Sequence, residues 1–145
     1  MKEPLLISAC LLGENCKYNG GNNRIPEADA LGERYDLIPI CPECQGGLPT
    51  PRVPAERRGG RVLTQDGRDV TAEYRLGAEI ALRAAREKNC TKALLKERSP
   101  SCGRGRIYDG SFTHTQVEGD GVAAELLGKN GLTIYGESRV SELLK

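Results

Sequence analysis

The sequence predicts an α/β fold, in which residues 1–145 form a single domain built as a three-layer sandwich around a mostly parallel, Rossmann-like sheet. Four short apolar runs alternate with segments of helical periodicity, which is the succession expected when crossover helices join parallel strands. Three of these runs end directly at a cysteine. Because ligands bind at the carboxyl ends of the strands in open α/β sheets, the same pattern predicts an active site at that edge.

The four predicted strands are short and rich in apolar residues. Residues 4–9 form a nearly continuous apolar run, which is typical of a strand buried on both faces of a parallel sheet. Residues 35–40, 92–96 and 132–135 are the other three predicted strands. The sequence does not define their order within the sheet.

Helices are expected between and after these strands. Residues 25–32 predict a short helix with a proline in its first turn and a glycine near its end. Residues 69–88 predict a long helix with its cap, and residues 122–129 and 139–144 predict two shorter helices, the last one capped by Ser138. Small and apolar side chains recur along one face of the long helix, which should therefore pack closely on the sheet: Val70, Tyr74, Gly77, Ala78, Ala81 and Ala85.

Long connecting segments follow three of the predicted strands. Residues 10–23 carry clusters of Asn and Gly that predict a loop. Residues 45–58 are rich in proline and glycine and are expected to lack regular structure, as are residues 104–112. Residues 61–67 predict a small extended segment that ends in a turn. Long ordered loops in small domains are often functional, which directs attention to these segments.

Composition argues against a nucleic-acid or membrane partner. The 21 Lys and Arg residues are balanced by 20 Asp and Glu residues, so no strongly basic surface is expected. With one Phe, five Tyr and no Trp, the chain offers few stacking platforms for single-stranded nucleic acid. The start of the chain lacks the pattern of a signal peptide, and no run approaches the length of a membrane span. A cytoplasmic location is therefore expected.

Six cysteines in a cytoplasmic α/β chain point to a metal or thiol site rather than to disulfides. Cys10, Cys41 and Cys102 each follow a predicted strand, and three strand-end thiolates could hold either a zinc ion or three corners of a [4Fe–4S] cluster. Cys41 and Cys44 form a Cys-x-x-Cys pair, which also fits a persulfide or redox sulfur carrier. Cys90 lies at the opposite edge of the sheet and should be a small buried hydrophobic residue.

Several polar residues near these cysteines are candidates for catalysis or substrate binding. Glu43 could donate and accept a proton near the metal, or could simply accept backbone hydrogen bonds in its loop. Ser99 and Ser101 could position a substrate or a water molecule, although Ser99 could also only shape its turn. Arg52 suits a planar polar ligand as well as it suits solvent. The only histidine, His114, lies in an irregular stretch and is not expected to reach the site.

Several motifs resemble those of one family over nearly the whole chain. The matching segments are residues 8–13 (SACLLG), 16–20 (CKYNG), 41–43 (CPE), 46–52 (GGLPTPR), 69–71 (DVT), 99–103 (SPSCG), 108–112 (YDGSF) and 119–122 (GDGV). They resemble the thiouracil desulfidase (TudS) family, formerly a domain of unknown function. Asn19 departs from the family pattern, which usually has Asp, and Cys44 stands where a non-thiol residue is common. Cys44 could compete for a cluster or form a disulfide with Cys41 in air.

The resemblance implies a non-redox, [4Fe–4S]-dependent desulfidase that hydrolyses a thiolated pyrimidine such as 2-thiouracil to uracil and hydrosulfide. By this resemblance, Cys10, Cys41 and Cys102 are the cluster ligands, and the open iron takes the sulfur of the substrate. Glu43 becomes the acid/base residue and Ser99 an accessory catalytic residue. The implied partners are a small thiolated base or nucleoside and the iron–sulfur assembly machinery.

Overall fold

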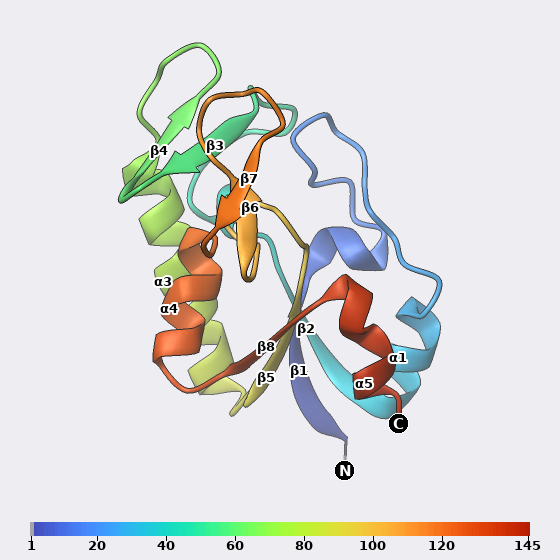
Figure 1. The fold of residues 1–145 in the computed structure, drawn as a ribbon. Coiled ribbons are helices and arrows are strands. Elements are labelled where there is room, and N and C mark those ends of the chain that lie inside the picture. The colour runs from blue at the N-terminus through green and yellow to red at the C-terminus, as the bar shows by residue number, and fades with distance from the viewer. Residues whose placement is uncertain (1) are drawn as a thin grey trace.

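The structure, a computed structural model that describes residues 2–145, is organised around a four-stranded parallel sheet (Figure 1). The order is β2-β1-β5-β8, and the three neighbouring pairs are all parallel. The bounds are Glu3–Ser8 for β1, Tyr35–Ile40 for β2, Lys92–Leu95 for β5 and Thr133–Gly136 for β8. The predicted α/β class is confirmed, and each strand lies within one residue of its predicted bounds.

The strand order creates a topological switch point between β1 and β5. From β1 the chain passes to β2 on one side and later returns to β5 on the other side. The connection after β1 leads to β2 and the connection after β5 leads to β8, so the two leave the carboxyl edge in opposite directions and their loops are held apart. A ligand site is therefore expected between the ends of β1 and β5.

Helices cover both faces of the sheet (Figure 1). One face packs against α3 (Thr71–Glu87) and α4 (Val122–Lys129), and the other packs against α1 (Ala28–Arg34) and α5 (Val140–Leu143). Because side chains alternate along a strand, β1 contributes to both buried layers. Its Leu6 joins the α3/α4 side, whereas Leu5 and Ile7 join the other.

The four predicted helices are present as α1, α3, α4 and α5, and all but α4 differ from the prediction at their ends. The α3 helix buries most of the predicted face, including Tyr74, Ala78 and Ala81. The α1 helix begins at Ala28 rather than at residue 25, because a turn precedes it. Ser138 does not cap the last helix: it lies inside a 3-10 turn, η2 (Glu137–Arg139), and donates to a carboxylate of Glu97. Among residues 2–145, no helix combines the length and apolar character that a membrane crossing requires.

Regular elements occur where irregular structure was expected, and β4 lies within the extended segment predicted over residues 61–67. Residues 55–58 form β3 (Ala55–Arg58), which pairs antiparallel with β4 (Arg61–Thr64). Likewise, β6 (Arg106–Tyr108) pairs antiparallel with β7 (Gln116–Glu118). The prolines that argued against structure end at residue 54, and these strands are too polar and too short to show an apolar alternation. A one-turn helix, α2 (Pro42–Gln45), and a 3-10 turn, η1 (Ala9–Leu12), also begin directly at strand ends.

Candidate active site

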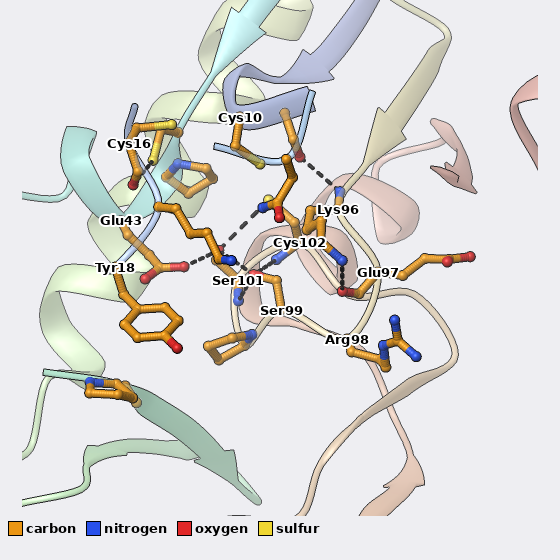
Figure 2. A pocket seen from close by; sticks show the side chains of 18 of the residues that line it. Cys10, Cys16, Tyr18, Glu43, Lys96, Glu97, Arg98, Ser99, Ser101 and Cys102 are labelled. Atoms are coloured by element: carbon orange, nitrogen blue, oxygen red, sulfur yellow. Dashed lines mark hydrogen bonds between the residues drawn. The ribbon is translucent and has the colours of Figure 1, made fainter. Parts of the chain in front are cut away.

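A cavity of about 420 Å³ opens at the carboxyl edge of the sheet, beside the ends of β1 and β5. Its volume lies in the range of small-molecule sites, about 300 to 1,000 Å³. The structure brings every predicted site residue to its wall: Cys10, Cys41, Glu43, Arg52, Ser99, Ser101 and Cys102. In Figure 2, the side chains of Cys10, Glu43 and Ser101 are directed toward the same space. The expected convergence of distant strand ends is therefore observed.

Close backbone packing fixes the segment that carries Cys41 and Glu43. The α2 helix lies on α3, and a Cβ atom added to Gly77 would sit 1.8 Å from the carbonyl oxygen of Pro42. A Cβ atom on Gly46 would likewise sit 2.0 Å from the carbonyl oxygen of Glu73. Only glycine permits these approaches, so α3 defines the height of α2 above the sheet. Cys41 stands at the N-cap of α2 and Glu43 in its first turn.

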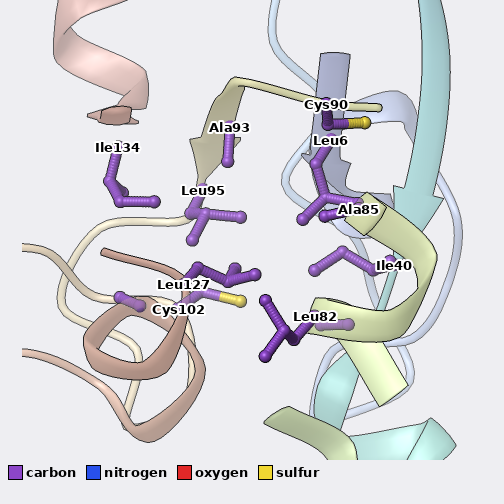
Figure 3. Packing of buried hydrophobic residues seen from close by; sticks show 12 residues of the cluster. Leu6, Ile40, Leu82, Ala85, Cys90, Ala93, Leu95, Cys102, Leu127 and Ile134 are labelled. Carbon is purple, nitrogen blue, oxygen red and sulfur yellow. The ribbon is translucent and has the colours of Figure 1, made fainter. Parts of the chain in front are cut away.

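The loop that carries Cys102 is held by the start of α4. The Val122 N–H donates to the Pro100 carbonyl at 2.9 Å, and the Ala123 N–H donates to the Ser101 carbonyl at 2.8 Å. These bonds satisfy donors that the first turn of a helix leaves without partners. Cys102 itself is buried where the cavity wall meets the apolar layer between sheet and helices, near Leu82 and Leu127 (Figure 3).

Burial keeps the three strand-end thiols protonated. It raises the pKa of Cys10 and Cys41, and it raises the pKa of Cys102 to about 12. A hydrogen bond from Ser8 acts in the opposite direction on Cys102. A thiolate is the form that binds metal, so a positively charged group in the cavity would be needed to ionise these thiols. All six cysteines are free thiols.

The spacing of the thiols does not match a site for one ion. Among residues 2–145, no three His, Cys, Asp or Glu side chains converge closely enough to hold a single metal ion. Tetrahedral zinc would need sulfur atoms about 3.8 Å apart, given Zn–S bonds of about 2.3 Å. An iron–sulfur cluster binds each cysteine to a different iron, which spreads the ligands over a wider cavity. The three cysteines line one cavity of about 420 Å³, and thiols are the donors that such a cluster takes.

Glu43 is held by a partly buried ion pair with Arg52. The Arg52 Nε donates to Glu43 Oε1 at 3.0 Å, and the two side chains are 6% and 15% exposed. The other Arg52 nitrogens donate to the carbonyls of Cys16 and Pro49 and to the Thr50 hydroxyl. Burial lowers the pKa of Arg52, but the Glu43 carboxylate more than offsets this and the pKa is raised. Because its guanidinium is bonded to protein throughout, Arg52 holds Glu43 in place, whereas direct contact with a ligand was expected.

A directed chain of hydrogen bonds links Ser99 to Glu43. The Ser101 hydroxyl donates to Glu43 Oε2 at 3.0 Å, and it lies 3.0 Å from the Ser99 hydroxyl. Since the Ser101 proton is used on the carboxylate, Ser99 must be the donor in the second bond. The Ser99 oxygen also accepts the backbone N–H groups of Ser101 and Cys102, at 3.2 and 3.1 Å. Ser99 therefore shapes its turn, and its hydroxyl points toward the acid/base candidate.

Two further thiols lie beside Cys41. The sulfur atoms of Cys41 and Cys44 are 3.9 and 3.8 Å from the carbonyl oxygen of Cys16. Arg52 Nη1 lies 3.6 Å from the Cys44 sulfur. The loop of residues 10–23 thus brings Cys16 to the Cys-x-x-Cys pair, so the thiol pair predicted from the sequence is a group of three.

Some cavity residues have no signal in the sequence. His114 lines the cavity, against expectation, because the β6–β7 hairpin folds over the sheet edge and places it near Tyr108, with ring centroids 6.0 Å apart. Tyr18 and Lys96 also line the wall. A motif centred on cysteines could not identify them, although Lys96 could have been found as the last residue of a predicted strand. Cys90 is buried at the far end of α3, as predicted.

Comparison with known proteins agrees with this geometry. Residues 5–139 match the family model of the 2-thiouracil desulfurases. The chain belongs to the 2-thiouracil desulfurase family. It is 38% identical to YbbK of Bacillus subtilis (strain 168), an uncharacterized protein, over 150 residues that cover 97% of this chain and 99% of that protein. A solved structure described as the [4Fe–4S]-dependent thiouracil desulfidase TudS is 46% identical, with a TM-score of 0.94, over 98% of this chain and 95% of that one. The family resemblance seen in the sequence is confirmed.

Proposed function

We propose that this protein is a [4Fe–4S]-dependent desulfidase that hydrolyses a thiolated pyrimidine such as 2-thiouracil to uracil and hydrosulfide. The observation that carries the proposal is the meeting of Cys10, Cys41 and Cys102 around one cavity that Glu43 also lines. Membership of the 2-thiouracil desulfurase family supports the substrate class, and the similarity to TudS supports the cofactor.

The three strand-end cysteines are the proposed ligands of the cofactor. When bound there, a [4Fe–4S] cluster would supply a Lewis-acidic iron without a protein ligand, which can take a sulfur atom. Cys10 and Cys41 reach the cavity from the turns that follow β1 and β2, and Cys102 from the loop after β5. Because the three cysteines lie on three separate segments, they surround the cavity and do not converge on a single ion among residues 2–145.

The proposed role of Glu43 is to accept and return protons. Hydrolysis breaks the carbon–sulfur bond and forms a carbon–oxygen bond to water, with no net oxidation or reduction. The water must lose protons while hydrosulfide leaves, which requires a base that faces the cavity. Arg52 fixes one oxygen of Glu43, and Ser101 binds the other. The carboxylate therefore meets the reactants in one orientation.

Ser99 and Ser101 extend the reach of Glu43. A proton on Ser99 can pass to Ser101 as Ser101 passes its own to Glu43, because the two bonds point in the same direction. The backbone N–H groups of Ser101 and Cys102 would stabilise the negative charge left on the Ser99 oxygen. We infer that Ser99 acts on the substrate or its attacking water and that Ser101 relays the proton, in place of the substrate contact expected for Ser101.

A second candidate function follows from the three adjacent thiols. Cys16, Cys41 and Cys44 lie side by side, an arrangement that also suits a carrier of persulfide sulfur. A carrier would need Cys44, whereas the desulfidase needs only Cys41 of this group. The Cys44→Ser variant separates the two: the desulfidase keeps its hydrosulfide release, and the carrier loses sulfur transfer.

The deciding experiment is anaerobic purification followed by an absorption spectrum and analysis of iron and sulfide. The desulfidase should be brown, contain about four irons per chain, and release hydrosulfide from 2-thiouracil. Serine at Cys10, Cys41 or Cys102 should remove the iron, while Cys90→Ser, at the far end of the sheet, should keep it. A colourless anaerobic protein with stoichiometric zinc would overturn the proposal. The proposal places the protein in the cytoplasm, where iron–sulfur assembly proteins would be partners.

A further inference from the structure

Lys96 is a cation held in the cavity wall, directly after β5. Its Nζ forms an ion pair with Glu137 Oε2 at 3.0 Å and donates to the Glu97 carbonyl at 3.1 Å. The side chains of Lys96 and Glu137 are 22% and 21% exposed. Figure 2 shows Lys96 folded back toward Glu97 in the cavity wall. A lysine so little exposed to solvent needs a reason beyond solubility.

The backbone of Lys96 is tied to the strand that precedes Cys10. Its N–H donates to Ser8 Oγ at 2.9 Å, and Ser8 is the buried last residue of β1. The Ser8 oxygen accepts this bond, and the Ser8 hydroxyl donates its proton to the sulfur of Cys102. The backbone of Lys96 is thereby fixed at the switch point between β1 and β5, on the side of the cavity where Cys10 follows β1.

Four Lys and Arg side chains line the cavity, and Lys96 is the one that directly follows β5. Arg52 is neutralised by Glu43, Lys17 lies over the Tyr18 ring at 5.9 Å, and Arg98 is exposed at the rim. The charge of Lys96 acts on Cys10, and the charges of Glu137 and Glu43 act there in the opposite direction. Lys96 is therefore within electrostatic reach of this proposed ligand.

A cluster held by three thiolates carries a net negative charge, which is costly in a partly buried cavity without a cation nearby. We propose that Lys96 is the charge-compensating residue of this site, stabilising the thiolate-bound cofactor from the Cys10 side, and that Glu137 limits that effect. Lys96 acts through the ligands and is a positioning residue rather than a catalytic one. The inference rests on the proposed function.

The test compares Lys96→Met, Lys96→Arg and Glu137→Gln after anaerobic reconstitution, by iron content and by the midpoint potential of the bound cluster. Loss of a nearby positive charge makes an anionic cluster harder to reduce, and loss of a negative charge makes it easier. We expect Lys96→Met to lower the potential and to lose iron, and Glu137→Gln to raise the potential and keep its iron. Lys96→Arg should stay close to the wild type.

The opposite shifts in midpoint potential expected for Lys96→Met and Glu137→Gln distinguish an electrostatic role of Lys96 from a structural one. If the Lys96–Glu137 pair only held the loop together, Lys96→Met and Glu137→Gln would lose iron and thermal stability alike, and neither potential would move; that result overturns the inference. If Lys96→Met does not fold, the upward shift of Glu137→Gln still decides. A wild-type protein that takes up no iron at all would instead overturn the proposed function, and this inference with it.

Discussion

The Arg52 guanidinium lies against the Glu43 carboxylate, with Nε 3.0 Å from Oε1, in a part of the cavity wall where both side chains are largely shielded from water. A charge in such a place depends on its partner, because removing one member leaves the other buried and uncompensated. The other oxygen of Glu43 accepts a hydrogen bond from the Ser101 hydroxyl. The reactivity proposed for Glu43 therefore depends on residues from two distant loops.

Arg52→Met should destabilise the cluster-free protein by about 3 kcal/mol, the cost typical of breaking a buried pair. Glu43→Gln in the same background should recover part of that loss, because it removes the unpaired charge. Urea unfolding of the two single variants and the double variant measures the coupling. If the single losses simply add up, the pair contributes nothing to stability.

Gly77→Ala should destabilise the protein by about 1 to 3 kcal/mol, because the new methyl group would strike the Pro42 carbonyl and lift α2 from α3. Gly128→Ala is the matched control inside α4, where the nearest atom to an added Cβ is the flexible Arg104 side chain at 3.3 Å. That variant should be neutral or slightly stabilising, since alanine is the better helix former. Chemical denaturation gives the unfolding free energies of the two variants. Equal losses would contradict the close contact between Gly77 and the Pro42 carbonyl.

Tyr74 should make stability fall at high pH. Burial, and then the charge of Glu43, raise the pKa of its hydroxyl above the ordinary value of 10.0. The unfolded chain ionises first, so the contribution of Tyr74 is complete below about pH 10 and is lost as the pH rises beyond it. Tyr74→Phe should be less stable than the wild type at pH 7, by about 1 kcal/mol for the lost hydrogen bond to Glu43.

The two stability curves should then converge above pH 10, because only the wild type carries this titration. Unfolding free energies of cluster-free protein in reductant, measured across pH 7 to about 11, check the slope. Parallel curves would show that the Tyr74 hydroxyl is accessible to solvent.

Glu56 should control the hairpin that brings His114 and Tyr108 to the cavity. Its Oε1 accepts the backbone N–H groups of Gly110 and Phe112, at 3.0 and 3.2 Å. Glu56→Ala should lower kcat/KM by about tenfold, the equivalent of about 1.4 kcal/mol, without changing the iron content. Glu56→Gln keeps the acceptor oxygen and should retain most activity. A drop of the same size in both variants would point instead to direct use of the charge.

The sequence allowed the sheet and the meeting of Cys10, Cys41 and Cys102 at one edge to be predicted, because both depend on short-range patterns. Apolar runs mark strands that are buried on both faces, and a cysteine after such a run must lie at one edge. The two hairpins were missed because their strands are charged and only three or four residues long. Contacts between side chains that are distant in the sequence leave no local sequence signal. The pairing of Arg52 with Glu43 and the position of His114 at the cavity both depend on how separate loops pack together.

The topological switch at β1 has a consequence for assembly. The segments that end in Cys10, Cys41 and Cys102 are neighbours only after the parallel strands β2, β1 and β5 have paired. A chain still emerging from the ribosome offers no such grouping until most of it has been synthesised. In small metal domains, metal binding drives folding. This protein would instead fold first and take up its iron–sulfur cluster afterwards.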